Sequence, residues 1–87
     1  MPKVERTVTV MNKQGLHARP AAIFVQIASK YFSSITVKKD KENVNGKSIM
    51  GILMLGAHQH SQVTITAEGE DAEKALAELE GFLSRNE

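Results

Sequence analysis

The stretch QVTITA, Gln62–Ala67, alternates apolar and polar residues along its whole length. In an extended chain Val63, Ile65 and Ala67 share one face, and the two threonines between them share the other. A strand of this kind buries one face only, so it belongs in a sheet that is covered by helices on one side and wetted on the other. The stretch therefore predicts an α+β fold.

Other segments extend this prediction in both directions. Alternation also predicts strands over Lys3–Val10 and Ile35–Lys39, with a short strand near Val44. Apolar residues at helical spacing predict a helix from Ala18 to about Ser29, a short one from the N-cap Ser48 through Leu55, and a last one from Asp71 to about Arg85. The order is β-α-β-β-α-β-α, and we expect one domain, 1–87, with a four-stranded antiparallel sheet under three helices.

Composition limits the kinds of protein this chain can be. The 87 residues are 41% hydrophobic and 24% charged, which is ordinary for a globular domain, and they include no cysteine. The N-terminus MPKVERTVTV lacks the apolar run of a signal peptide, and the most apolar run, IMGILMLGA, is too short to span a bilayer. We therefore expect a cytoplasmic protein without a membrane insertion.

Charge is unevenly spread along the chain. Residues 1–67 hold nine Lys/Arg and three Asp/Glu, whereas residues 68–87 hold two and seven. A basic body is typical of proteins that meet nucleic acid or acidic partners, or it is simply a solvated surface. Aromatic residues make up only 5% of the chain, and Phe24 and Phe82 fall on predicted core stripes, so no stacking platform for nucleic acid remains.

His17, in the stretch QGLHARPAAIF, lies at the expected mouth of the first long helix. A helix N-terminus has free backbone N–H groups and a positive dipole end, so it binds anions and favours a neutral imidazole. Arg19 adds a guanidinium that matches phosphate oxygens. The pattern fits either a histidine that caps the helix or a ring that receives a phosphoryl group and hands it on.

Metal binding is the weaker interpretation of the histidines. No carboxylate or second histidine lies at ligand spacing from His17 on its helix, and His58 and His60 alone offer two ligands on an extended segment. We therefore expect no metal site and no organic cofactor.

Two motifs carry a resemblance that covers essentially the whole chain. GLHARPAAIFVQIASKY and NGKSIMGILMLGA, whose His17 and Ser48 are thirty-one residues apart, together resemble the HPr family of histidine-containing phosphocarriers of the bacterial phosphoenolpyruvate:sugar phosphotransferase system. The resemblance implies an open-faced β-sandwich. It also implies that Nδ1 of His17 accepts a phosphoryl group from enzyme I and donates it to enzyme IIA domains, with Arg19 attending the phosphate.

Ser48 is implicated twice. From its position it caps the short helix, and by resemblance it is the serine that an HPr kinase/phosphorylase modifies in many relatives. A phosphate at a helix N-terminus is tolerated there, so it would act on partners rather than on folding. The letters GKS do not indicate a nucleotide-binding loop, because Lys41 stands where that motif needs glycine.

The short helix is apolar nearly all round, which a helix of this size at the surface cannot bury completely. Either it sinks into the core, or Ile52 and Leu55 face inward and the other apolar residues form a docking surface. The expected partner-binding residues are Ala18, Arg19, Lys47, Ile49, Met50 and Leu53. We expect a monomeric carrier without catalytic activity of its own. The alternative is a nitrogen-branch regulatory phosphocarrier of the same family.

Overall fold

The computed structural model describes residues 2–85, and its elements follow the expected order. They are β1 (Lys3–Thr9), α1 (Ala18–Ser29), β2 (Ser34–Lys39), β3 (Glu42–Asn45), α2 (Ile49–Leu55), β4 (Gln62–Glu68) and α3 (Ala72–Ser84). Each bound lies within a residue or so of its prediction. At the last helix, Asp71 and Arg85 flank α3 instead of belonging to it.

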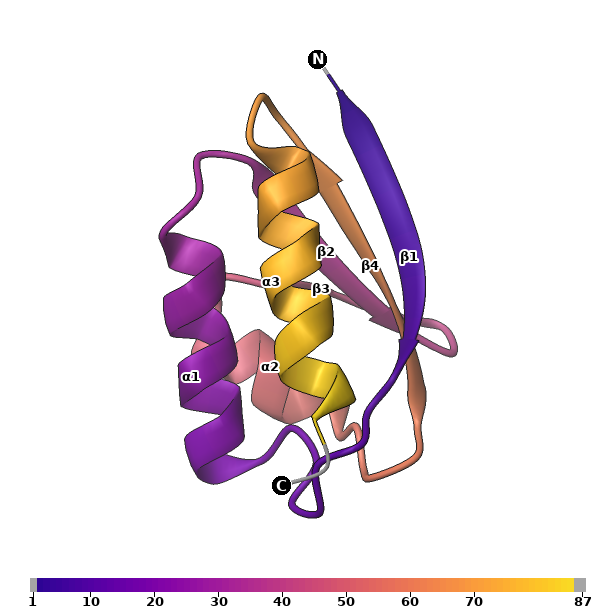
Figure 1. Cartoon of the computed structure of the whole chain (residues 1–87). Helices are drawn as coiled ribbons and strands as arrows, with labels where there is room; N and C mark the ends of the chain where they lie inside the picture. The colour runs from indigo at the N-terminus through magenta and orange to yellow at the C-terminus, as the bar shows by residue number, and fades with distance from the viewer. Residues whose placement is uncertain (1, 86–87) are drawn as a thin grey trace.

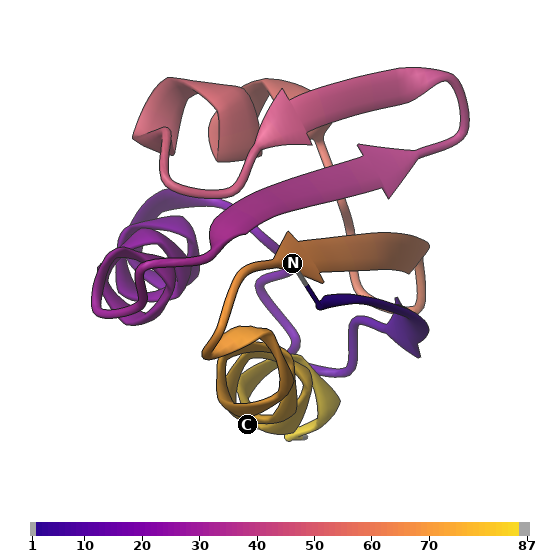
Figure 2. The same ribbon diagram turned by 90° about the horizontal axis from the view of Figure 1, so that it is seen from above.

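The four strands form one antiparallel sheet in the order β1-β4-β2-β3. The alternating stretch in β4 is therefore a central strand, with Ile65 opposite both Arg6 of β1 and Val37 of β2. Figure 2 shows the sheet edge-on, with all three helices along one of its faces. This confirms the α+β fold, an open-faced β-sandwich.

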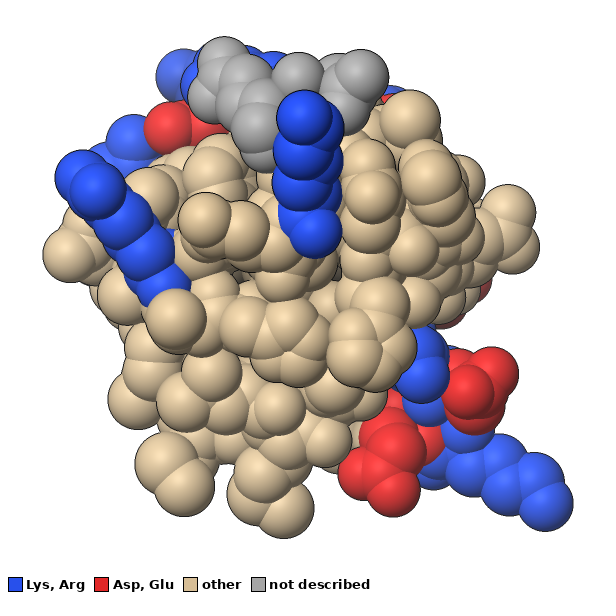
Figure 3. Space-filling model, turned by 90° about the horizontal axis from the view of Figure 1, so that it is seen from below, with Lys and Arg blue, Asp and Glu red and all other residues tan. Residues whose placement is uncertain are grey.

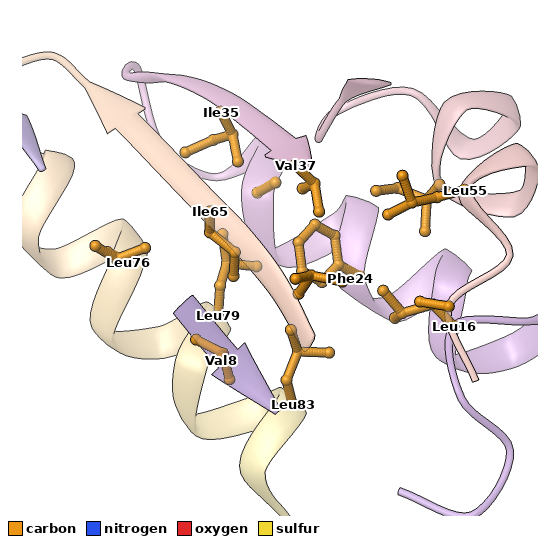
Figure 4. Packing of buried hydrophobic residues seen from close by; sticks show 14 of the residues in the cluster. Val8, Leu16, Phe24, Ile35, Val37, Leu55, Ile65, Leu76, Leu79 and Leu83 are labelled. Atoms are coloured by element: carbon orange, nitrogen blue, oxygen red, sulfur yellow. The ribbon is translucent and has the colours of Figure 1, made fainter. Parts of the chain in front are cut away.

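A single hydrophobic core fills the space between sheet and helices. Phe24 projects from α1 toward Val37, and Leu16 and Leu55 close one side of the cluster (Figure 4). From α3, the fully buried Leu76, Leu79 and Leu83 complete it. The predicted stripe on α3 is correct except for Phe82, which is only partly buried.

On its other face the sheet is polar, as the threonines predicted. The hydroxyls of Thr7 and Thr64 on neighbouring strands lie 3.1 Å apart, and Thr66 donates a hydrogen bond to Glu5. Over residues 2–85, no helix combines the length and the apolar character needed to cross a membrane.

Three segments that are distant in sequence meet at one end of the molecule. The first turn of α1, the helix α2 and the C-terminal end of α3 all lie toward the bottom of Figure 1. That end carries the histidine identified from the sequence.

Candidate functional site

His17 occupies the N-cap position of α1 with an extended backbone, φ −120° and ψ 157°. Its ring is half-buried and makes no hydrogen bond to the helix backbone, so the interpretation of this histidine as a side-chain cap is wrong. Gly15, at φ +66°, makes the turn before it, and Asn12 Nδ2 donates to the Gly15 carbonyl at 2.8 Å. The fully buried Leu16 then anchors the chain directly before the histidine.

Ala18, the first residue of α1, has a φ of +44°. Alanine rarely adopts the left-handed region, because its Cβ crowds the backbone there. Such conformations persist only where the surroundings impose them, and they concentrate at functional sites. The strained residue Ala18 therefore directly follows His17, the candidate phosphoacceptor, in the sequence.

The partner of the His17 ring comes from a distant loop. Nε2 of His17 lies 3.3 Å from Nδ1 of His58, and the two ring centroids are 5.1 Å apart at a tilt of 47°. The sequence analysis predicted that His58 and His60 both lie on one extended segment. That expectation is wrong, because His60 lies in a turn at φ +75°. Among residues 2–85, no group of three His, Cys, Asp or Glu side chains gathers in a way that would hold a metal ion.

A hollow of about 180 Å³ opens beside the first turn of α1. Its lining residues are Asn12, Gln14, Arg19, Pro20, Ile23, Phe82 and Arg85. Arg19 lines this hollow together with Arg85, which the sequence reasoning missed. The two guanidinium groups make this side of the first turn of α1 positively charged, and His17 is not among the residues that line the hollow.

Ser48 is the N-cap of α2, as predicted, and its hydroxyl accepts a hydrogen bond from the Gly51 N–H at 3.0 Å. Gly56 ends the same helix at φ +65°. The neighbouring Lys47 donates from Nζ to the carbonyl of Tyr31 at 2.6 Å, at the C-terminal end of α1. Lys47, directly before Ser48, therefore links the start of α2 to the C-terminal end of α1 through its long side chain.

On α2 the apolar residues divide as the docking interpretation requires. Ile52 and Leu55 are buried, whereas Met50 is 62% exposed and Ile49 39%. Leu53 is partly buried. Met54, which the sequence reasoning missed, is 70% exposed, and its spacing of four from Met50 places both on one face. Ile49, Met50, Leu53 and Met54 are called the α2 patch below.

The surface around this end is basic or uncharged. When the molecule is viewed from below, Lys and Arg side chains project from a broad uncharged surface, and the acidic side chains in view lie at the edges of this surface (Figure 3). Ala18 and Arg19 are both exposed. Lys30, near the C-terminal end of α1, pairs through its Nζ with Glu78 of α3 at 2.8 Å.

Comparison with known proteins gives consistent matches over most of the chain. The family "PTS HPr component phosphorylation site" matches residues 4–85. The HPr-like protein Crh of Bacillus subtilis is 44% identical over 80 residues, which cover 92% of this chain and 94% of Crh. The phosphocarrier protein HPr of Treponema pallidum is 44% identical over 77 residues, 88% of each chain.

Solved structures show the same similarity. HPr from Bacillus anthracis superimposes with a TM-score of 0.93 at 48% identity, covering 94% of this chain and 98% of its own. An HPr dimer from Thermoanaerobacter tengcongensis gives a TM-score of 0.69 at 56% identity over 83% of each chain.

An open-faced β-sandwich with a histidine and an arginine at the mouth of its first helix defines a phosphocarrier, a protein that holds a phosphoryl group in transit and is not itself a catalyst. The chain belongs to the HPr family of the phosphotransferase system. Its similarity divides between HPr and Crh.

Proposed function

We propose that Nδ1 of His17 accepts a phosphoryl group from phospho-enzyme I and donates it to enzyme IIA domains of sugar permeases. The observation that carries this proposal is the position of the His17 ring, which lies at the N-terminus of α1 and makes no hydrogen bond to the helix backbone. The free N–H groups of the first turn and the Arg19 guanidinium stabilise the incoming phosphate. The chain needs no bound metal or organic cofactor for this chemistry, because transfer between carriers is mainly positioning and charge stabilisation.

Incubation with phosphoenolpyruvate and enzyme I, followed by intact mass measurement, tests the assignment. The chain should gain one phosphoryl group that acid removes, and His17→Ala should abolish the gain. His60→Asn is the matched control, since His60 is an exposed histidine in a left-handed turn that asparagine tolerates. Uptake of an acid-labile phosphate by His17→Ala would contradict the proposal.

The α2 patch, with Ala18, Arg19 and Lys47 around it, is proposed as the surface that receives enzyme I and the enzyme IIA domains in turn. Exposed methionines adapt to several partners, and the surrounding cations suit acidic proteins. Met50→Asp should slow transfer from enzyme I by about tenfold, since one buried charge at an interface costs more than 1.4 kcal/mol. The matched control is Phe32→Asp, because Phe32 is 98% exposed but lies beyond the far end of α1. Equal rates for both folded variants would contradict the docking surface.

A regulatory role is proposed for Ser48 as the target of an HPr kinase/phosphorylase. Its position beside the exposed Ile49 and Met50 supports this role, because a phosphate there adds negative charge to the edge of the α2 patch. The purified kinase with ATP should modify the wild type and not Ser48→Ala. Modification of the variant would place the target elsewhere.

The chain is proposed to work in the cytoplasm as a single-domain monomer. Sedimentation at several concentrations separates this from the dimeric state described for the Thermoanaerobacter tengcongensis HPr. The nitrogen-branch alternative has different partners and a signalling output. A comparison of phosphoryl transfer to sugar-specific and nitrogen-branch IIA domains therefore decides between the two.

A further inference from the structure

The imidazole of His58 contacts the proposed phosphoacceptor, and the transfer chemistry above does not use it. Its Nδ1 lies 3.3 Å from Nε2 of His17, which leaves Nδ1 of His17 outside this contact. The contact joins the loop after α2 to the mouth of α1, and the two residues are 41 positions apart. One of the two nitrogens must donate and the other accept, so the contact couples the tautomers of the two rings.

Backbone hydrogen bonds fasten the His58 loop to the segment before His17. The Leu16 N–H donates to the Ala57 carbonyl at 2.8 Å, one residue before each histidine. Further along, the His60 N–H donates to the Val10 carbonyl at 2.6 Å. His58 is itself held in a turn, in which its N–H donates to Ser61 Oγ at 3.1 Å and the Ser61 N–H donates back to its carbonyl at 3.0 Å.

A side chain placed in this way can select the tautomer of its neighbour. Nδ1 is the ring nitrogen closer to the backbone, and the backbone at His17 is the N-terminus of α1. The positive end of a helix favours a lone pair over an N–H bond, so the proton belongs on Nε2. Nε2–H then has Nδ1 of His58 as its acceptor, and His58, an exposed residue, carries its own proton on Nε2.

We propose that His58 is a positioning residue, whose Nδ1 accepts the Nε2–H of His17 and so holds His17 in the tautomer with a free lone pair on Nδ1. This proposal rests on the phosphoacceptor function of His17 and adds a residue to it. No proton is released in the transfer step. Nδ1 of His17 bonds to phosphorus, and the bond from phosphorus to the donor's leaving atom breaks with its electron pair. In the positively charged phospho-imidazolium, the Nε2–H of His17 remains hydrogen-bonded to Nδ1 of His58. Donation of the phosphoryl group to the next carrier reverses the step. Hydrogen bonds from a charged donor are stronger than neutral ones, so His58 stabilises the loaded ring more than the empty one.

Long-range proton–nitrogen correlation spectra of the full chain, labelled with ¹⁵N, test the tautomer directly in the unphosphorylated protein. Spectra are recorded with a chelator at about pH 8, where neutral histidine rings predominate. In the wild type, His17 and His58 should both show the Nε2–H form. His58→Ala should turn His17 into a mixture of tautomers. His58→Asn should restore the Nε2–H form, because its Oδ1 takes the place of Nδ1 at the same number of bonds from the backbone. His58→Gln, whose carbonyl is one bond further out, should not restore it.

Transfer from phospho-enzyme I should follow the same order. His58→Ala should lower the rate by about tenfold, and His58→Asn should recover most of it, because the charge-assisted hydrogen bond returns. His60→Asn should match the wild type in both measurements.

Three results would overturn the proposal: an Nδ1–H tautomer for His17 in the wild type, a tautomer unchanged in His58→Ala, or a preference that appears only when Zn²⁺ replaces the chelator. The last would mean that the two rings share a metal ion. Failure of the phosphoacceptor function is distinguishable, because it would leave the tautomers as described while no phosphoryl group appears on His17.

Discussion

The phenol of Tyr31, just beyond α1, donates a hydrogen bond to the carboxylate of Glu78 on α3, which also accepts one from Lys30 Nζ at 2.8 Å. The bond to Glu78 is the main reason that the pKa of Tyr31 is raised above its ordinary 10.0, and burial and the nearby carboxylate charges add to it. The pKa of Glu78 is lowered, first by the bond from Lys30 and then by the bond from Tyr31. This cluster ties the far end of α1 to α3.

Titration of Tyr31 gives a direct measure of that cluster. The chain has one tyrosine, so tyrosinate absorbance reports on this residue alone. In the wild type, the midpoint should lie above 10.0, and Glu78→Gln should bring it back toward that value, because a neutral amide does not repel the phenolate. Glu80→Gln, on the same helix but bonded to Arg6, should leave the midpoint where it is. Equal midpoints for wild type and Glu78→Gln would show that the bond does not persist in solution.

A second carboxylate fastens the loop between α1 and β2. Asp71 accepts hydrogen bonds from the Phe32 and Ser33 N–H groups at 2.8 and 2.9 Å and from the Ser33 hydroxyl. These bonds, led by that of the Ser33 hydroxyl, lower the pKa of Asp71 below its ordinary 3.8. A folded-state pKa below the unfolded value stabilises the protein above the unfolded pKa, and this stabilisation is lost as the pH falls through the folded one.

Thermal melts of Asp71→Asn and wild type as a function of pH test this linkage. The variant should melt at a lower temperature at neutral pH, and the difference should shrink as the pH falls below 3.8. Ser33→Ala, which removes one donor and keeps the charge, should lose less at neutral pH than Asp71→Asn. A difference that stays constant down to acid pH would assign the effect to packing instead of to the carboxylate.

Local patterns in the chain predicted most of the fold, because alternation in Gln62–Ala67 and the cap at Ser48 depend on neighbouring residues. The same is true of the position of His17 at a helix mouth. The two contacts that were missed join distant residues. His17 meets His58 across 41 positions and Ser33 meets Asp71 across 38, and no periodicity encodes which loops the sheet brings together. Helical spacing assigned Asp71 to its helix, whereas its side chain bonds the neighbouring loop.

Gly15 controls how closely the His17 and His58 loops approach. A Cβ at this position would lie 2.5 Å from the Ala57 carbonyl oxygen and 2.9 Å from Cα of His58, in a backbone at φ +66°. Gly15→Ala should therefore cost about 1–3 kcal/mol of unfolding free energy and displace His58.

Urea denaturation, together with the His17 tautomer spectrum, measures both effects. Gly81→Ala in α3 is the matched control, because nothing lies within 4 Å of its added Cβ. It should raise stability by about 0.5–1 kcal/mol, since alanine is favoured over glycine inside a helix. A Gly15→Ala variant as stable as the wild type would mean that the two loops separate at no cost.

Ser48 has a capping role and a proposed regulatory role, and two substitutions separate them. Ser48→Ala removes the hydroxyl that accepts from the Gly51 N–H, so it should lower the unfolding free energy by about 1 kcal/mol. Ser48→Asp keeps an N-cap acceptor and adds a charge that suits the helix N-terminus, so its stability should stay within about 0.5 kcal/mol of the wild type.

Phosphoryl transfer from enzyme I should rank the same variants in the opposite order. Ser48→Ala leaves the α2 patch uncharged and should transfer at nearly the wild-type rate. Ser48→Asp places a negative charge beside the exposed Ile49 and Met50, and it should slow transfer several-fold by weakening attraction to an acidic partner. Urea unfolding and single-turnover transfer, measured on the same preparations, give both rankings. If the aspartate variant transfers as fast as the wild type, charge at Ser48 does not regulate docking at the α2 patch.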